Sequence, residues 1–281
     1  MLSFLNVLKK LFSLLFACGL LVSGSVNAVF NGDIYPFDSS DGVIGIETLT
    51  RAQGVTNNGT YWYFSGKNCL EKVSMETGEI AALNVSAIPA EIAALGGKHI
   101  GGIGYANGYI YAPIEDSKVW QHPVIALYDA ETLAYTGIFF ELSTQRHTRG
   151  VPWCFADAGN GVIYAGDSRN DAEAFLYDIN TFEYLGSLTY AREIADIQGG
   201  EYYNGKLYLG TNDMTRAVYV VDARSGEAEK LFDRITYEYK LIDNFGGEGE
   251  DITVCPLPDG TYIHTLQLGA LFVDATLRHY K

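Results

Sequence analysis

The sequence predicts an all-β protein, a five-bladed β-propeller, and three observations support this prediction. Turn dipeptides that strongly favour β-hairpins recur five times: Asn58-Gly59, Asn107-Gly108, Asn160-Gly161, Asn204-Gly205 and Asp259-Gly260. Their glycines are 49, 53, 44 and 55 residues apart, a period typical of propeller blades. Apart from the short segment Ala87 to Leu95, no window of ten or more residues shows a convincing helical stripe, which argues against an α/β fold.

Each repeat predicts four short strands in chain order. The first strand ends at the turn dipeptide, and the second carries a large residue three positions after the glycine: Trp62, Tyr111, Tyr164, Tyr208 or Ile263. A third run follows, and in four repeats it ends near an aspartate. Of these we expect Asp129, Asp178 and Asp222 to form turns rather than bind ligands. One more short run completes the blade.

The ring needs a closing strand, because the fifth repeat stops at Lys281 soon after its third strand. A spare apolar run from Val43 to Leu49 precedes the first repeat. We expect this early strand to complete the last blade and so to hide the open sheet edges. A six-bladed ring would result if Phe30 to Ser40 contributed more than a lead-in.

Residues 1–28 have the features of a secretory signal peptide: Lys9 and Lys10, an apolar run to Leu21, and a polar stretch that ends at Ala28. Cys18 leaves lipidation open as an alternative. We therefore expect one propeller domain, residues 29–281, in a secreted or periplasmic protein. The remaining thiols, Cys69, Cys154 and Cys255, are expected to be buried and reduced, with a Cys69–Cys255 bridge as the alternative.

The net charge of the chain limits the kinds of partner that it can bind. The chain has 34 acidic and 19 basic residues, a formal charge of -15, which repels phosphate backbones and excludes a general nucleic-acid binder. No apolar run reaches the length of about 20 residues that a membrane-spanning helix needs. We expect a monomer.

The repeat register predicts where ligands bind. Residues before the first strand and after the second strand of each blade meet at one face, opposite the Asn-Gly turns. This rim is rich in carboxylates, amides and glycines, and a concave channel mouth suits a ligand. The candidate ligand-binding residues are Gln53, His99, Glu115, Trp153, Asp167, Gln198 and Asp213. The predicted ligand is a small molecule, a peptide or a glycan.

The run from Arg51 to Val55, with Asn58-Gly59, the aromatic residues from Tyr61 to Phe64 and the turn at Glu76-Thr77-Gly78, resembles the opening blade of the plant-type and bacterial glutamine cyclotransferases. That resemblance implies a secreted five-bladed propeller that cyclises an N-terminal glutamine, with Gln53 at the channel mouth. The sequence differs from the family where the second blade opens, at Gly101-Gly102-Ile103-Gly104. The segments from His99 to Tyr111 and from Gly247 to Asp251 also look like a broader group of uncharacterised secreted propellers.

Cyclisation needs a carboxylate that takes a proton from the substrate amine and returns one to the departing ammonia. Glu248 and Glu250 are the catalytic candidates, and their crowding is expected to keep one of them protonated. A bound Ca²⁺ is another solution for crowded acids, with Glu115, Asp167 and Asp213 as candidate ligands. Such an ion would suit a propeller hydrolase of the lactonase or esterase type. The sequence thus leaves open whether the protein is an enzyme.

Overall fold

The computed structural model describes residues 37–116, 119–168, 170–234, 247–269 and 272–281. All of them belong to one compact unit, Pro36–Lys281. The proposed signal peptide, residues 1–28, and Cys18 lie outside the described residues. In the part of the chain that the structure describes, no helix is long and apolar enough to cross a membrane.

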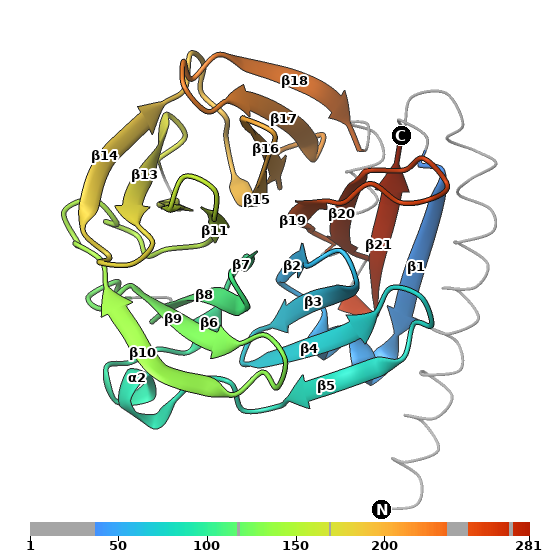
Figure 1. Ribbon diagram of the computed structural model, residues 1–281, viewed down its shortest axis with the longest axis horizontal. Coiled ribbons are helices and arrows are strands. Elements are labelled where there is room, and N and C mark those ends of the chain that lie inside the picture. The colour runs from blue at the N-terminus through green and yellow to red at the C-terminus, as the bar shows by residue number, and fades with distance from the viewer. Residues whose placement is uncertain (1–36, 117–118, 169, 235–246, 270–271) are drawn as a thin grey trace, which may run out of the picture. The chain divides into compact units, whose positions relative to one another are not determined.

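Five antiparallel sheets stand in a ring (Figure 1), and this confirms the five-bladed propeller. The described residues form no sixth sheet. Blade one contains β2 (Gly54–Asn57), β3 (Tyr61–Gly66), β4 (Cys69–Ser74) and β5 (Ile80–Asn84). Blade two contains β6 (His99–Ile100), β7 (Gly104–Ala106), β8 (Tyr109–Glu115), β9 (Val124–Asp129) and β10 (Tyr135–Glu141). The helix α2 (Ala90–Ala94) precedes it, within the expected helical segment.

The remaining blades follow the same plan. Blade three contains β11 (Cys154–Asp157), β12 (Val162–Ala165), β13 (Glu173–Asp178) and β14 (Tyr184–Thr189). Blade four contains β15 (Ile197–Tyr203), β16 (Lys206–Thr211), β17 (Ala217–Asp222) and β18 (Ala228–Asp233). Blade five contains β19 (Gly249–Val254), β20 (Ile263–Leu268), β21 (Asp274–Tyr280) and β1 (Ser39–Ile44).

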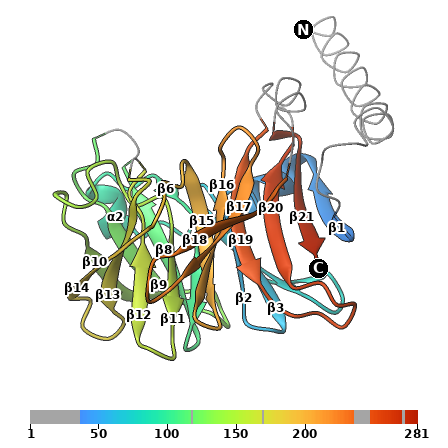
Figure 2. The ribbon, with the colours of Figure 1, turned by 90° about the horizontal axis from the view of Figure 1, so that it is seen from above.

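The Asn-Gly dipeptides form the predicted hairpin turns. At Asn107-Gly108 and Asn204-Gly205 both residues have positive φ, the conformation that a two-residue hairpin of type I′ requires. Figure 2 shows that the hairpins β2–β3 and β11–β12 turn at the same face of the ring. Asp129, Asp178 and Asp222 form turns as predicted, since each carboxylate accepts hydrogen bonds from the backbone two and three residues later.

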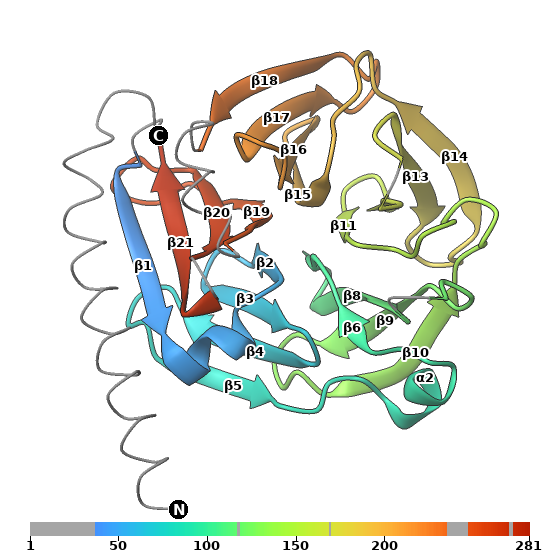
Figure 3. The ribbon, with the colours of Figure 1, turned by 180° about the vertical axis from the view of Figure 1, so that it is seen from behind.

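A strand from the N-terminal side closes the ring, as Figure 3 shows from behind. β1 pairs antiparallel with β21, from Ser39 opposite His279 to Ile44 opposite Asp274. The predicted bounds, Val43 to Leu49, were wrong, because a 3₁₀ helix, η1 (Gly45–Thr50), replaces most of that strand. The physical reason is Gly45, whose φ of 82° ends the extended backbone.

The space between blades is filled by aliphatic and aromatic side chains. The three described cysteines are buried and free, which confirms reduced thiols and excludes the alternative Cys69–Cys255 bridge in this structure. Between blades three and four, the rings of Trp153, Phe155, Tyr164 and Tyr202 stack in sequence. We call this column the aromatic stack; its first three rings are buried in the core and Tyr202 is half-buried.

Asp251 joins the inner strands around the channel. It is fully buried, and its Oδ2 accepts hydrogen bonds from the backbone N–H groups of Val55 (3.0 Å) and Ile103 (3.1 Å). A Cβ atom at Gly199 of blade four would lie 1.7 Å from Oδ1, so only glycine fits there. One carboxyl group therefore bonds blades one and two to blade five and packs against blade four.

Candidate functional site

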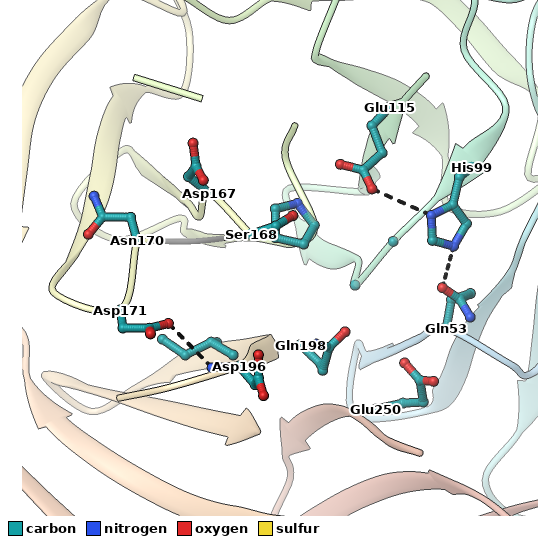
Figure 4. Close-up of a pocket in the computed structure, with 14 residues that line it drawn as sticks. Gln53, His99, Glu115, Asp167, Ser168, Asn170, Asp171, Asp196, Gln198 and Glu250 are labelled. Carbon is teal, nitrogen blue, oxygen red and sulfur yellow. Dashed lines mark hydrogen bonds and ion pairs between the residues drawn. The ribbon is translucent and has the colours of Figure 1, made fainter. Parts of the chain in front are cut away.

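A polar pocket, here called the mouth pocket, lies where the inner strands of the blades begin (Figure 4). Its volume is about 130 Å³, and residues from all five blades line it. They are Gln53, His99, Gly101, Gly102, Glu115, Pro152, Asp167, Ser168, Asn170, Asp171, Asp196, Ile197, Gln198 and Glu250. The convergence follows from the propeller register, because each blade brings the same strand ends to the channel mouth.

Six of the predicted site residues line this pocket: Gln53, His99, Glu115, Asp167, Gln198 and Glu250. Trp153 does not line it. Its side chain is 1% exposed and occupies the space above Gly166, where a Cβ atom would lie 2.2 Å from the indole ring. Asp213 is engaged in its own turn, accepting hydrogen bonds from the N–H groups of Thr215 and Ala217.

His99 bridges Gln53 and Glu115 at one wall of the mouth pocket. Gln53 donates from Nε2 to the carbonyl oxygen of Ala52 at 2.6 Å, so its Oε1 faces His99 and accepts a hydrogen bond from His99 Nε2. These contacts assign the proton to Nε2 of the imidazole. Nδ1 of His99 then faces Oε1 of Glu115 at 3.6 Å, which is an ion pair only when the imidazole is protonated.

Glu115 ends β8 and places a carboxylate at the edge of the mouth pocket. Its Oε2 atom is buried and has no hydrogen-bond partner among the described residues. Gly150 makes this position tight, because a Cβ atom there would lie 1.9 Å from Oε2. An unpartnered buried acceptor costs about 1–3 kcal/mol, and a donor group on a bound ligand would remove that cost.

Glu250, in β19, is a second buried acid at this pocket. It is 3% exposed, and its Oε1 atom has no hydrogen-bond partner in the described part of the chain. Burial raises the pKa of Glu250 well above its ordinary value, and the charge of neighbouring Glu248 raises it further. The shift favours a protonated carboxyl, in the direction that the Glu248–Glu250 pair predicts. Glu248 itself is not among the residues that line the pocket.

Three more carboxylates complete the lining. Asp167 accepts hydrogen bonds at Oδ2 from Thr148 Oγ1 (2.9 Å) and from the N–H of Arg149 (3.2 Å). Asp171 accepts one from the N–H of Asp196 at 3.3 Å, and burial raises the pKa of Asp171. Asp171 and Asp196 were not among the predicted site residues. The available signal was their position, since Asp196 directly precedes β15 and Asp171 follows the strand-two rim segment.

The three proposed calcium ligands do not all line the mouth pocket. Glu115 and Asp167 line the mouth pocket but Asp213 does not. Across the described ranges, no three His, Cys, Asp or Glu side chains lie together in an arrangement that would hold a metal ion. The structure thus places Glu115 and Asp167 at the mouth pocket and Asp213 in its own turn, and calcium binding stays a prediction.

Comparisons with known proteins do not assign the chain to a family. No family model matches the sequence, and neither does any curated protein. Among solved structures, hydrazine synthase from Kuenenia stuttgartiensis is similar over 79% of this chain and 56% of that chain, at 13% identity and a TM-score of 0.45. The computationally designed Ika4 protein is similar over 60% of this chain and 88% of that one, at 12% identity and a TM-score of 0.35.

The chain thus spans little more than half of the hydrazine synthase chain that it matches. Neither likeness carries an argument about activity. The resemblance to the glutamine cyclotransferases remains a hypothesis. Any function proposed for the chain therefore rests on the residues of the mouth pocket.

Proposed function

We propose that this protein is a ligand-binding propeller whose mouth pocket takes a small molecule, or the end of a peptide, that carries a protonated amino group. The observation that carries the proposal is the lining. It contains five carboxyl groups, from Glu115, Asp167, Asp171, Asp196 and Glu250, and no Lys or Arg among the described residues. Arg169, which follows Ser168 in the chain, lies outside the described residues.

Two unpartnered oxygens support a ligand with N–H donors. Glu115 Oε2 and Glu250 Oε1 are both buried without partners among the described residues, and both residues line the same pocket. The great majority of buried polar atoms in proteins have a hydrogen-bond partner. A volume of about 130 Å³ admits a small aliphatic amine or a single side chain, and it lies below the range of drug-sized pockets.

Isothermal titration calorimetry with putrescine and agmatine tests this proposal, with the neutral 1,4-butanediol as the matched compound. We expect the amines to bind and the diol to show no binding. Glu115→Gln replaces a charge-assisted hydrogen bond by a neutral one and is expected to weaken amine binding about ten- to hundredfold. Glu229→Gln removes the same charge from the exposed face of β18 and serves as the control. Equal affinity of the Glu115→Gln and Glu229→Gln variants would contradict the proposal.

A second candidate function is glutaminyl cyclisation, and the environment of Glu250 favours it. Burial and the charge of Glu248 raise the pKa of Glu250 well above its ordinary value, which is the direction that a carboxyl group needs for general acid–base catalysis. The substrate amine would attack the side-chain carbonyl carbon of its own glutamine, the C–N bond of the amide would break, and ammonia would leave. Glu250 would take the amine proton and return one to the ammonia.

The variant Glu250→Gln separates the two functions. Glutamine resembles a protonated glutamate in shape and keeps a carbonyl acceptor, but it cannot take a proton from the substrate amine. A cyclase would lose turnover in this variant, as seen by mass spectrometry of a glutamine-initiated peptide. Ammonia loss above the spontaneous rate in the wild type, abolished by both Glu250→Gln and Gln53→Ala, would establish cyclisation. No ammonia loss in the wild type would leave the binding function.

We also propose that residues 1–28 direct secretion, on the strength of the leader pattern alone. Intact-mass measurement of the protein recovered from its source tests this. A mature chain that begins at Val29 is expected, and a chain that retains the leader would refute cleavage.

A further inference from the structure

A second cavity, here called the turn groove, lies at the opposite ends of the same strands that form the mouth pocket. The strand β15 illustrates this, because Ile197 and Gln198 line the mouth pocket and Tyr202 lines the turn groove. The groove has a volume of about 510 Å³ and lies between the hairpin turns of blades three and four. This volume is within the range of small-molecule sites and exceeds that of the mouth pocket.

One wall of the turn groove is aromatic. Tyr164 and Tyr202 come from different blades, and their rings stack with centroids 6.3 Å apart and an angle of 9° between planes. Phe155 packs behind Tyr164 at 5.3 Å, and Tyr164 is only 4% exposed, so the half-buried Tyr202 is the ring of this pair that a ligand can reach. Asn160 donates from Nδ2 to the hydroxyl oxygen of Tyr202 at 3.3 Å, which holds a further polar group beside the ring.

Two other residues of the groove supply positive charge. Lys206 and Arg224 are exposed, line the groove and form no salt bridge within the described part of the chain. The nearby Asp222 carboxylate accepts hydrogen bonds from the N–H groups of Arg224 and Ser225 at its own turn. Asp222 also lines the groove and lies opposite Lys206 in the β16–β17 register, so the groove lining carries two cations and one carboxylate on a chain with a formal charge of -15.

We propose that the turn groove binds an acidic carbohydrate, meaning a short chain of sugars that carry carboxylate groups. The face of a sugar ring is apolar and packs on an aromatic ring, while its hydroxyls hydrogen-bond to polar groups such as the exposed amide of Asn204. Lys206 and Arg224 would bind the carboxylates, and Arg can do so through two parallel hydrogen bonds. The proposal is independent of any ligand at the mouth pocket.

Calorimetric titration with trigalacturonate tests the proposal, and the neutral maltotriose is the matched sugar. We expect saturable binding of the acidic sugar and at least about tenfold weaker binding of the neutral one. The double variant Lys206→Met, Arg224→Met is expected to weaken trigalacturonate binding at least about tenfold. Lys230→Met removes one exposed cation from the outer strand of the same blade and is expected to leave binding unchanged.

The aromatic wall is tested by Tyr202→Ala, which should also weaken binding about tenfold, and by Tyr202→Phe, which keeps the stacked ring and should largely retain it. Circular dichroism of each variant checks the fold. The proposal is overturned if trigalacturonate shows no saturable binding, if maltotriose binds equally well, or if the Lys206 and Arg224 double variant binds like the wild type. Putrescine, a proposed ligand of the mouth pocket, is not expected to compete with trigalacturonate for the turn groove.

Discussion

The buried acid Glu201 makes the stability of this propeller depend on pH. Glu201 lies in β15, is 8% exposed, and accepts hydrogen bonds at Oε2 from Thr253 Oγ1 (2.8 Å) and Thr56 Oγ1 (3.2 Å). Burial raises the pKa of Glu201 to about 8, from an ordinary 4.5, although the two hydroxyl donors oppose the shift. The folded state therefore binds this proton more tightly than the unfolded state does.

The size of this pH effect on the free energy of unfolding follows from the pKa of Glu201 in the folded and unfolded states. One pKa unit corresponds to about 1.4 kcal/mol, so ionising Glu201 costs the fold roughly 5 kcal/mol relative to the unfolded chain. A raised carboxyl pKa means that the native state holds more protons between pH 4.5 and 8. The contribution of Glu201 to stability is thus fully present below pH 4.5 and is lost as the pH rises to 8.

The substitution Glu201→Gln removes the titrating group and keeps an oxygen that accepts from both threonines. We expect the free energy of unfolding of the variant, relative to the wild type, to rise by several kcal/mol between pH 5 and pH 8. Urea denaturation followed by tryptophan fluorescence at a series of pH values measures it. Glu250 and Asp251 titrate in the same direction in both proteins, so only the difference is diagnostic. A difference that stays constant across this pH range would show that Glu201 does not lose a proton in the folded protein as the pH rises.

Three further predictions concern the fold. Asp251→Ala leaves the buried N–H groups of Val55 and Ile103 without acceptors and should lower the free energy of unfolding by at least about 2 kcal/mol; a loss below about 0.5 kcal/mol in urea denaturation would count against its joining role. Gly166→Ala forces a Cβ atom against the Trp153 indole and should cost about 1–3 kcal/mol with a change in near-UV circular dichroism, whereas an unchanged melting curve would show spare room there. Deletion of residues 37–44 removes β1 and exposes the edge of β21, so size-exclusion chromatography should show self-association, and a stable monomer would contradict ring closure by this strand.

The repeat architecture was predictable because local turn chemistry determines it. The Asn-Gly turns need positive φ, and this need holds whatever the rest of the chain does. The closing strand was predictable in kind but not in its bounds. Strand β1 begins with the polar residues Ser39, Ser40 and Asp41. These residues need no apolar pattern, because they pair at the outer edge of the blade. The apolar residues Ile46 and Leu49 look like strand residues but lie in η1, and both are largely exposed.

The mouth pocket was predictable where the repeat register places one residue of each blade at the channel. Gln53, His99, Gln198 and Glu250 follow that register and line the pocket. Trp153 has the same register, but the space above Gly166 takes its side chain into the core. Gly166 lies directly opposite Trp153 across the β11–β12 hairpin, where its N–H donates to the Trp153 carbonyl oxygen, and its missing side chain leaves room for the indole.

The buried acids Glu201 and Asp251 were the least predictable part of the channel. Both stand in inner strands where an alternating pattern would place an apolar residue. Their partners, the hydroxyls of Thr56 and Thr253 and the N–H groups of Val55 and Ile103, come from other blades. Only the closed ring brings these groups together.

We propose that the mouth pocket binds an amino group through Glu115, and a crystal structure of the protein soaked with agmatine or putrescine at neutral pH tests this contact. We expect a ligand nitrogen within about 3 Å of Glu115 Oε2, with His99 still bonded to Gln53. An amine bound elsewhere, or a mouth pocket that holds only water while the amine binds in solution, would contradict it.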